Sequence, residues 1–206
     1  VTICAHDFEI HLDIYSEAHG EGHAAALAAA LRSALAPHLF TEEDRSIAEI
    51  VLGACRERGL TLATAESCTG GMVAARLTDL PGSSDVFLGG VVAYSDTVKR
   101  QALGVLPATL ATHGAVSAET AAAMAEGARV RLGADVAVAV TGVAGPGGGS
   151  DAKPVGLVHF HAVGPDGNLA TSFEIPGRRE WVRTRGTVAA LHLVRRLLEQ
   201  SRHEGG

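Results

Sequence analysis

In the segment Ala65-Glu66-Ser67-Cys68-Thr69-Gly70-Gly71, a hydroxyl and a thiol lie between an apolar run and two glycines, and the fold of the chain can be inferred outward from this point. The apolar segment, residues 60–65, is predicted to be a buried strand that ends in a tight turn before a helix. This order lifts a side chain out of the fold and directs helix amides towards it. Ser67 is therefore a candidate nucleophile with Cys68 as its rival. The other interpretation is that Ser67 or Thr69 only caps the helix.

Apolar runs alternate with helical patterns through the rest of the main segment. Further strands are predicted over 86–94, 134–141, 155–163 and 169–175. The last two strands flank Pro165-Asp166-Gly167, which predicts a hairpin and makes part of the sheet antiparallel. Helices are predicted over 42–58, 71–79, 96–103, 118–132 and from about Arg178 onward. The pattern is typical of the α/β class.

Residues 1–40 are predicted to be a segment separate from the main domain. Phe8 to Ile14 alternate between apolar and polar side chains, as a strand does, and the alanine-rich run from Glu21 to Ala36 predicts a helix that ends at Pro37. One strand and one helix cannot enclose a core. We therefore expect the tail of a preceding domain over 1–40 and the main domain over 41–206, beginning with Thr41 as a helix cap. A first residue of Val1 rather than Met suggests that an upstream portion is missing.

Composition narrows the class of protein. With 206 residues, 47% hydrophobic and 19% charged, the chain can bury one full core. A net charge of -6 argues against a nucleic-acid surface, which needs clustered cations. Three widely spaced cysteines suggest neither a disulfide framework nor a zinc site, so a reducing cytoplasm is expected. No apolar run is long enough to span a bilayer.

Lysine is rare in this chain: of 17 cationic residues only Lys99 and Lys153 are lysines. If Tyr94 ends a strand and Lys99 lies in the first turns of the next helix, both can point over the sheet edge that carries Ser67. Burial, a neighbouring cation such as Arg100 or a tyrosine hydroxyl would make the amine a base. The other interpretation is a surface lysine on an exposed helix.

A glycine-rich segment and a pair of histidines can each be interpreted as functional or as purely structural. Residues 141–150, Thr-Gly-Val-Ala-Gly-Pro-Gly-Gly-Gly-Ser, are not a P-loop, but glycines after a central strand let a backbone approach a ligand and cradle a phosphate. The alternative is a floppy surface connection. His159 and His161 share one face of a strand and would need a third ligand to bind a metal, so we expect no metal.

Five motifs together resemble the CinA C-terminal domain family over about residues 45 to 200. They are Ala65 to Gly71, Tyr94-Ser95 with Lys99, His113-Gly114-Ala115-Val116-Ser117, Thr141-Gly142-x-Ala144-Gly145-Pro146, and Lys153-Pro154-Val155-Gly156. The resemblance implies a three-layer α/β/α sandwich with a mixed, mostly parallel sheet. Residues 1–40 are similar to the end of the region that precedes this domain in longer CinA proteins, so a short strand-helix appendage is expected.

The family contains nicotinamide-nucleotide amidases, so the resemblance implies hydrolysis of the carboxamide of nicotinamide mononucleotide to nicotinic acid mononucleotide and ammonia. Ser67 would attack the amide carbon, Lys99 would take its proton, and Tyr94 would orient or relay. Amides around Thr69, Gly70 and Gly71 would hold the oxyanion. The full set of expected substrate-binding residues is Glu66, Thr69, Gly70, Gly71, Thr141, Gly142, Gly145, Gly147 and Arg178.

The resemblance also sets expectations about partners. The reaction needs no cofactor, the substrate is a pyridine nucleotide, and family members commonly associate, so a homodimer is expected. Two alternatives stay open. One is a regulatory module that binds a nucleotide without turning it over, and the other is an amidase that depends on Cys68.

Overall fold

The computed structural model describes residues 1–6, 8–17, 21–36 and 38–203, and the chain divides into two compact units, Val1–Arg45 and Ser46–Gly206. The division falls five residues after the predicted boundary. Among the described residues, no helix is both long enough and apolar enough to cross a membrane.

The first unit contains a hairpin and a helix. Strands β1 (Thr2–His6) and β2 (Glu9–Asp13) pair antiparallel, and α1 spans Glu21–Leu35. The prediction of a single strand here was wrong, because β1 was missed. Phe8 adopts a φ of 65°, a left-handed conformation normally signalled by Gly or Asn, so the sequence carried no turn signal at the hairpin. Pro37, which was expected to end the helix, lies outside the described residues.

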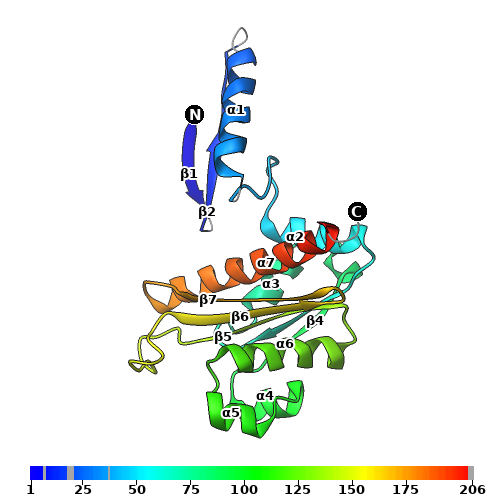
Figure 1. Cartoon of the computed structure of the whole chain (residues 1–206), viewed down its shortest axis with the longest axis vertical. Helices are drawn as coiled ribbons and strands as arrows, with labels where there is room; N and C mark the ends of the chain where they lie inside the picture. The colour runs from blue at the N-terminus through cyan, green and yellow to red at the C-terminus, as the bar shows by residue number, and fades with distance from the viewer. Residues whose placement is uncertain (7, 18–20, 37, 204–206) are drawn as a thin grey trace. The chain divides into compact units, whose positions relative to one another are not determined.

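The second unit is built on a five-stranded sheet in the order β4-β3-β5-β6-β7 (Figure 1). Its strands are β3 (Leu62–Glu66), β4 (Phe87–Val92), β5 (Val136–Gly142), β6 (Leu157–Gly164) and β7 (Gly167–Glu174). β3 runs parallel to β4 and β5, whereas β6 runs antiparallel to β5 and β7. The mixed sheet and the hairpin are confirmed, but antiparallel pairs are as frequent as parallel ones, so the sheet is not mostly parallel.

Helices cover both faces of this sheet, as the three-layer prediction required (Figure 1). One layer holds α2 (Ile47–Glu57), α3 (Met72–Thr78) and α7 (Arg179–His203), with a short 3-10 turn at Ser83–Asp85. The other layer holds α4 (Asp96–Leu103), α5 (Pro107–His113) and α6 (Ala118–Leu132). The sequence did not predict α5, because it has seven residues and none of them is buried. Pro107, at its first position, is the only start signal.

The start of α2 differs from the prediction. Ser46 caps this helix in a capping box with Glu49, whose carboxylate accepts from the Ser46 amide at 2.7 Å. Thr41, the predicted cap, instead accepts a hydrogen bond from the amide of Glu43 in a turn before the helix. Both residue types are good caps, but only Ser46 has a Glu at the third helical position to complete a capping box.

Two features of this unit position the site. The carboxyl ends of β3, β4 and β5 meet at one edge of the sheet because these strands are parallel. α4 approaches α6 so closely that a Cβ built on Gly127 would lie 2.0 Å from the carbonyl oxygen of Leu103. The close approach holds α4 against the fold.

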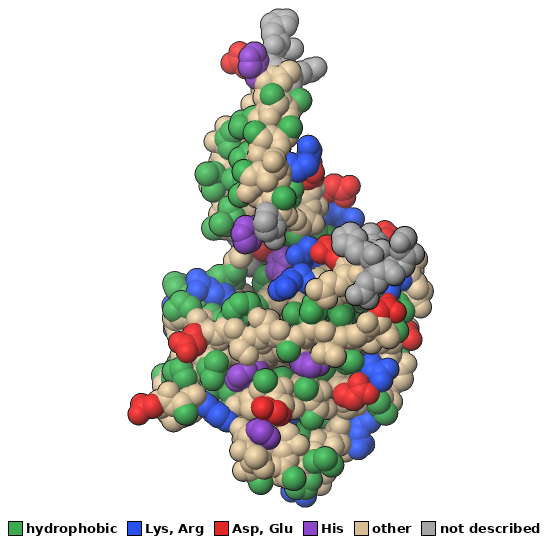
Figure 2. Space-filling model, in the orientation of Figure 1, with side chains coloured by type: hydrophobic (Ala, Val, Ile, Leu, Met, Phe, Trp, Pro, Cys, Tyr) green, Lys and Arg blue, Asp and Glu red, His purple; other side chains and the backbone are tan. Residues whose placement is uncertain are grey.

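Surface charge is mixed on the face shown in Figure 2, where Lys and Arg side chains are scattered among Asp and Glu side chains. That face has no continuous basic stripe of the kind that would follow a nucleic-acid backbone.

Replacing Gly127 with alanine is expected to lower the free energy of unfolding by about 2 kcal/mol, because the new methyl group overpacks the α4–α6 contact. Gly186 in α7 is the matched control, since a Cβ there would meet its nearest neighbour at 3.6 Å. Gly186→Ala should be neutral or stabilise by up to about 1 kcal/mol, because alanine favours helix. Denaturant unfolding measures both. A Gly127→Ala chain as stable as the parent would contradict the packing argument.

Candidate active site

Ser67 and Lys99 meet at the sheet edge. Ser67 directly follows β3, where its amide donates to the carbonyl oxygen of Val140 at 2.9 Å. Lys99 lies in the first turns of α4, and its Nζ is 3.1 Å from Ser67 Oγ. Ser67 is 8% exposed and Lys99 is 1% exposed, so the contact is shielded from water. The two residues are 32 positions apart in the sequence, and the fold brings their reactive atoms within hydrogen-bonding distance.

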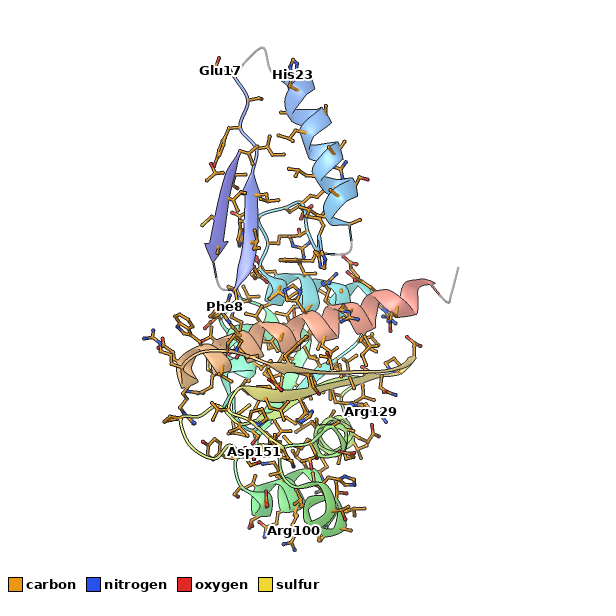
Figure 3. All side chains as sticks on the ribbon, turned by 60° about the vertical axis from the view of Figure 1, so that its left-hand side comes forward. Phe8, Glu17, His23, Arg100, Arg129 and Asp151 are labelled. Atoms are coloured by element: carbon orange, nitrogen blue, oxygen red, sulfur yellow. The ribbon has the colours of Figure 1, made fainter. Side chains whose placement is uncertain are left out.

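The surroundings of Lys99 favour its neutral form. Burial lowers the pKa of Lys99 below its ordinary value, and the Asp96 carboxylate and the Cys68 thiol oppose that shift more weakly. The carbonyl oxygen of Ala93 accepts from Nζ at 2.8 Å, which orients the amine towards Ser67. Arg100, expected to assist, is exposed on the outer side of α4 and points away from the sheet (Figure 3). The pKa of Lys99 is therefore lowered by desolvation rather than by a second cation.

Glu66 is buried and holds the turn that follows it. Its carboxylate accepts hydrogen bonds from the amides of Gly71, Val73 and Ala74 at 2.9, 3.1 and 2.8 Å. Each hydrogen bond to a charged group contributes about 1.5–3 kcal/mol. The carboxylate neutralises the positive end of α3 and fixes the path of the chain through Ser67. Glu66 is thus a positioning residue here rather than the substrate contact that was expected.

Two of the expected oxyanion donors already have acceptors. The Gly70 amide donates to the Ser67 carbonyl oxygen at 3.1 Å, and the Gly71 amide donates to Glu66. Both glycines have positive φ, at 64° and 97°, so glycine is required by the conformation of the turn. Of the three amides that were expected to hold an oxyanion, these two serve the turn itself.

Arg179 connects two of the predicted site residues, and the sequence analysis missed it. From the first turn of α7, its guanidinium donates to Tyr94 Oη at 3.0 Å and to the Gly145 carbonyl oxygen at 2.9 Å. Tyr94 is 61% exposed, and its hydroxyl meets Arg179 rather than Ser67 or Lys99. The hydroxyl of Tyr94 is therefore not placed to relay a proton between Ser67 and Lys99 in this arrangement. Its exposed position fits a role at the rim of the site.

A second arginine on α7 was also missed. Arg183 donates through Nε to the Cys68 carbonyl oxygen at 3.1 Å and through Nη2 to the Thr69 carbonyl oxygen at 2.9 Å. Arg178, which was predicted to bind substrate, pairs with Glu180 and lies over the Trp181 ring at 5.2 Å. The available signal was the i, i+4 spacing of Arg179 and Arg183 at a helix start, where the helix dipole disfavours cations.

The glycine-rich loop begins beside this group. Thr141 is buried, and its Oγ1 donates to the Ala115 carbonyl oxygen at 2.7 Å. A Cβ on Gly142 would lie 2.7 Å from the Leu157 carbonyl oxygen, so glycine there permits the β5–β6 pairing. Gly145 is buried under Arg179, whereas Gly147 is exposed and its Cβ would meet nothing within 4 Å. The loop is therefore anchored at Gly145 and exposed beyond it.

The competing nucleophile is poorly placed. Cys68 is 6% exposed, and burial raises the pKa of its thiol to about 11. A thiol with that pKa stays protonated near neutral pH and is a weak nucleophile.

His159 and His161, the two histidines on one face of β6, were considered as metal ligands. His159 Nδ1 lies 2.6 Å from Ser172 Oγ, and burial lowers the pKa of both His159 and His161. In the part of the chain that the structure describes, no three His, Cys, Asp or Glu side chains group so as to hold a metal ion.

Comparison with known proteins gives consistent matches. The family model for the CinA C-terminal domain matches residues 44–198. A CinA-like protein of Synechococcus sp. (strain RCC307) is 55% identical over 160 residues, which are 77% of this chain and 38% of that relative. A CinA-like protein of Mycobacterium avium (strain 104) is 54% identical over 165 residues, with shares of 78% and 38%. The chain thus spans less than half the length of these relatives.

Solved structures agree in fold. The competence/damage inducible protein CihA from Agrobacterium tumefaciens superposes with a TM-score of 0.71 at 42% identity, covering 78% of this chain and 99% of that one. A CinA superfamily protein from Klebsiella pneumoniae gives a TM-score of 0.72 at 36% identity, covering 75% and 96%. By the family model and these identities, the chain belongs to the CinA C-terminal domain family.

Proposed function

We propose that this chain hydrolyses the carboxamide of nicotinamide mononucleotide, giving nicotinic acid mononucleotide and ammonia. The observation that carries the proposal is the 3.1 Å contact between the buried amine of Lys99 and the hydroxyl of Ser67. A serine is activated by an adjacent base, and a desolvated lysine is such a base near neutral pH. Among the described residues, Lys99 is the buried lysine, and Ser67 is the serine that it contacts.

In the acylation step Ser67 Oγ attacks the amide carbon while its proton passes to the Lys99 amine. The resulting ammonium then donates that proton to the departing nitrogen, so ammonia leaves and an ester forms on Ser67. Water next attacks the ester carbon, Lys99 takes a proton from this water, and the proton returns to Ser67 as the acid leaves. Lys99 thereby serves as base and acid in both halves of the reaction.

The oxyanion formed in each half needs donors. Because the amides of Gly70 and Gly71 are engaged, we assign this role to the amides of Cys68 and Thr69, which belong to the same turn as Ser67. Both amides lie beside the Cys68 sulfur, which is a weak acceptor. The pyridinium ring of the substrate is already cationic and withdraws electrons from the amide, which assists attack.

Arg179 and Arg183 are suited to the phosphate end of the substrate. A guanidinium has five N–H donors, and Arg179 and Arg183 each use two of them on neutral oxygens. A phosphate is a stronger acceptor than those oxygens. The two arginines lie one helical turn apart on α7, beside the loop that begins after β5. Arg179 therefore replaces Arg178 in the proposed binding set.

The second candidate is a regulatory module that binds a nucleotide without hydrolysing it. The names of similar proteins, which refer to competence and damage, favour it. A dependence on Cys68 is disfavoured by its buried, protonated thiol. A homodimer and a cytoplasmic location are further proposals, and the three free cysteines agree with a reducing compartment.

Ser67→Ala should abolish ammonia release from nicotinamide mononucleotide, because no nucleophile remains, and Lys99→Met should lower kcat by at least about a hundredfold. An enzyme-coupled ammonia assay with chromatography of the acid product measures both. Cys68→Ala is the matched control on the neighbouring residue and should keep activity within about threefold.

Ammonia release that survives Ser67→Ala would contradict the mechanism. Loss of activity in Cys68→Ala with Ser67→Ala tolerated would instead support a cysteine amidase. Calorimetry that shows tight binding of the nucleotide without turnover would support the regulatory module.

Arg179→Gln should lower kcat/KM for nicotinamide mononucleotide by about 10- to 100-fold, the loss expected for a charged hydrogen bond. It should change kcat/KM little for the phosphate-free nucleoside, nicotinamide riboside. Arg178→Gln is the control at the adjacent residue and should affect neither substrate, because its side chain lies over Trp181. Equal losses of kcat/KM on both substrates would show that Arg179 does not bind the phosphate.

A further inference from the structure

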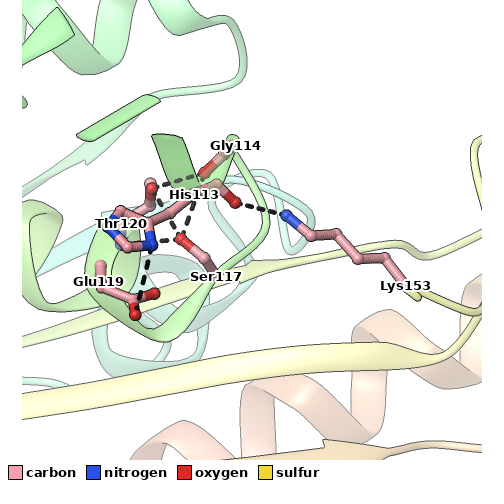
Figure 4. Close-up of polar contacts among 6 residues, drawn as sticks. All are labelled: His113, Gly114, Ser117, Glu119, Thr120 and Lys153. Atoms are coloured by element: carbon pink, nitrogen blue, oxygen red, sulfur yellow. Dashed lines mark hydrogen bonds and ion pairs between the residues drawn. The ribbon is translucent and has the colours of Figure 1, made fainter. Parts of the chain in front are cut away.

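Three consecutive carbonyl oxygens, those of His113, Gly114 and Ala115, each accept a hydrogen bond from a side chain of a different element. Lys153 Nζ donates to the His113 oxygen, and Thr120 Oγ1 of α6 donates to the Gly114 oxygen at 2.7 Å (Figure 4). Thr141 Oγ1 of β5 donates to the Ala115 oxygen at 2.7 Å. Ser117 Oγ adds a second bond to the Gly114 oxygen at 3.2 Å. This segment therefore joins α5, α6, the sheet and the glycine-rich loop.

Lys153 is the member of this group that comes from the loop. Its side chain approaches the backbone of Gly114 so closely that a Cβ built on that residue would lie 2.9 Å from Nζ. Glycine at 114 therefore makes room for the ammonium. The backbone of Lys153 is fixed separately by a pair of hydrogen bonds with Ser150, at 3.0 and 3.1 Å. The side chain of Lys153 can therefore join this turn to the end of α5 at His113.

The loop is held at two points and exposed between them. At its start the buried Gly145 is bound through its carbonyl oxygen to Arg179, and at its end Lys153 is bound to His113. All residues from 146 to 152 are exposed. A Cβ on Gly147 would meet nothing within 4 Å, so neither packing nor a positive φ explains that glycine. Glycine at 147 increases the freedom of the backbone at an exposed position, whereas a Cβ on Gly149 would lie 3.0 Å from Val155.

Both ties are bonds from a cation to a neutral carbonyl oxygen. A phosphate competes well for such cations, because bonds between two charged groups are shorter and stronger. The ties are therefore strong enough to order the loop, and they can open to admit an anionic ligand and form again behind it. Asp151 lies in this span on the α5 side of the sheet (Figure 3).

We propose that residues 146–152 form a lid at the edge of the Ser67 site and that Lys153 is its latch, a positioning residue that does not touch the reacting atoms. The lid itself follows from the anchoring of the loop. Its kinetic consequence rests on the proposed amidase function: a latched lid retains the nucleotide, so losing the latch weakens binding rather than chemistry.

The test is hydrogen–deuterium exchange of the span 146–152 in the full chain, compared among three variants. Lys153→Met removes the ammonium and keeps the length, and it should speed exchange in this span by about tenfold, as expected for loss of one charged hydrogen bond. Lys153→Arg keeps a donor and should restore protection. Arg131→Met is the matched control, because Arg131 also donates to a carbonyl oxygen, that of Gln101, but from the last turn of α6.

Kinetics supply the second measurement. Lys153→Met should raise KM for nicotinamide mononucleotide severalfold with kcat within about twofold of the parent. Unchanged exchange over 146–152 in Lys153→Met would overturn the latch. A fall in kcat with KM unchanged would overturn the positioning role. If the parent chain releases no ammonia at all, the amidase proposal fails while the exchange experiment still decides the latch.

Discussion

The burial of the Lys99 amine against Ser67 is the constraint on which the site depends. An ammonium at that position would lose most of its hydration, and its hydrogen bonds would go to the neutral oxygens of Ser67 and Ala93. The fold therefore favours a neutral amine, which is the form that can accept a proton. The supporting architecture follows from this: α4 must be held rigidly, and the contact at Gly127 brings it close to α6.

Charge around the site is divided between two helix starts. At α3 the buried Glu66 neutralises the helix end and binds its amides, so the turn through Ser67 is rigid but offers little positive charge to a ligand. At α7 the first turns carry Arg179 and Arg183, which reach the same turn and the glycine-rich loop. Under the proposed function, the phosphate would meet the arginines of α7 and the amide would meet Ser67, so the two ends of the substrate would contact different helix starts.

Much of this arrangement could be predicted from the sequence, because parallel strands bring their carboxyl ends together. The pairing of Ser67 with Lys99 and the placing of the glycine-rich loop at the same sheet edge follow from that rule. The bond that anchors this loop at Gly145 comes from Arg179, which was not predicted. The role of Glu66 could not be predicted, since a glutamate after a strand does not reveal which amides it will accept from. Nor could the choice of Arg179 over Arg178, which depends on the rotation of α7 against the sheet. Phe8 carries no residue-type signal for its left-handed conformation, and the short helix α5 has only Pro107 at its start.

The most direct test of the central claim is the titration of Lys99 itself. The chain contains only two lysines, Lys99 and Lys153, so isotope labelling of lysine side chains gives two signals that Lys99→Met and Lys153→Arg assign. An NMR titration should show Lys99 losing its proton below the ordinary lysine pKa of about 10.4. A Lys99 signal that titrates at or above that value would show that the amine is charged in the folded state, and the account of Ser67 activation would be wrong.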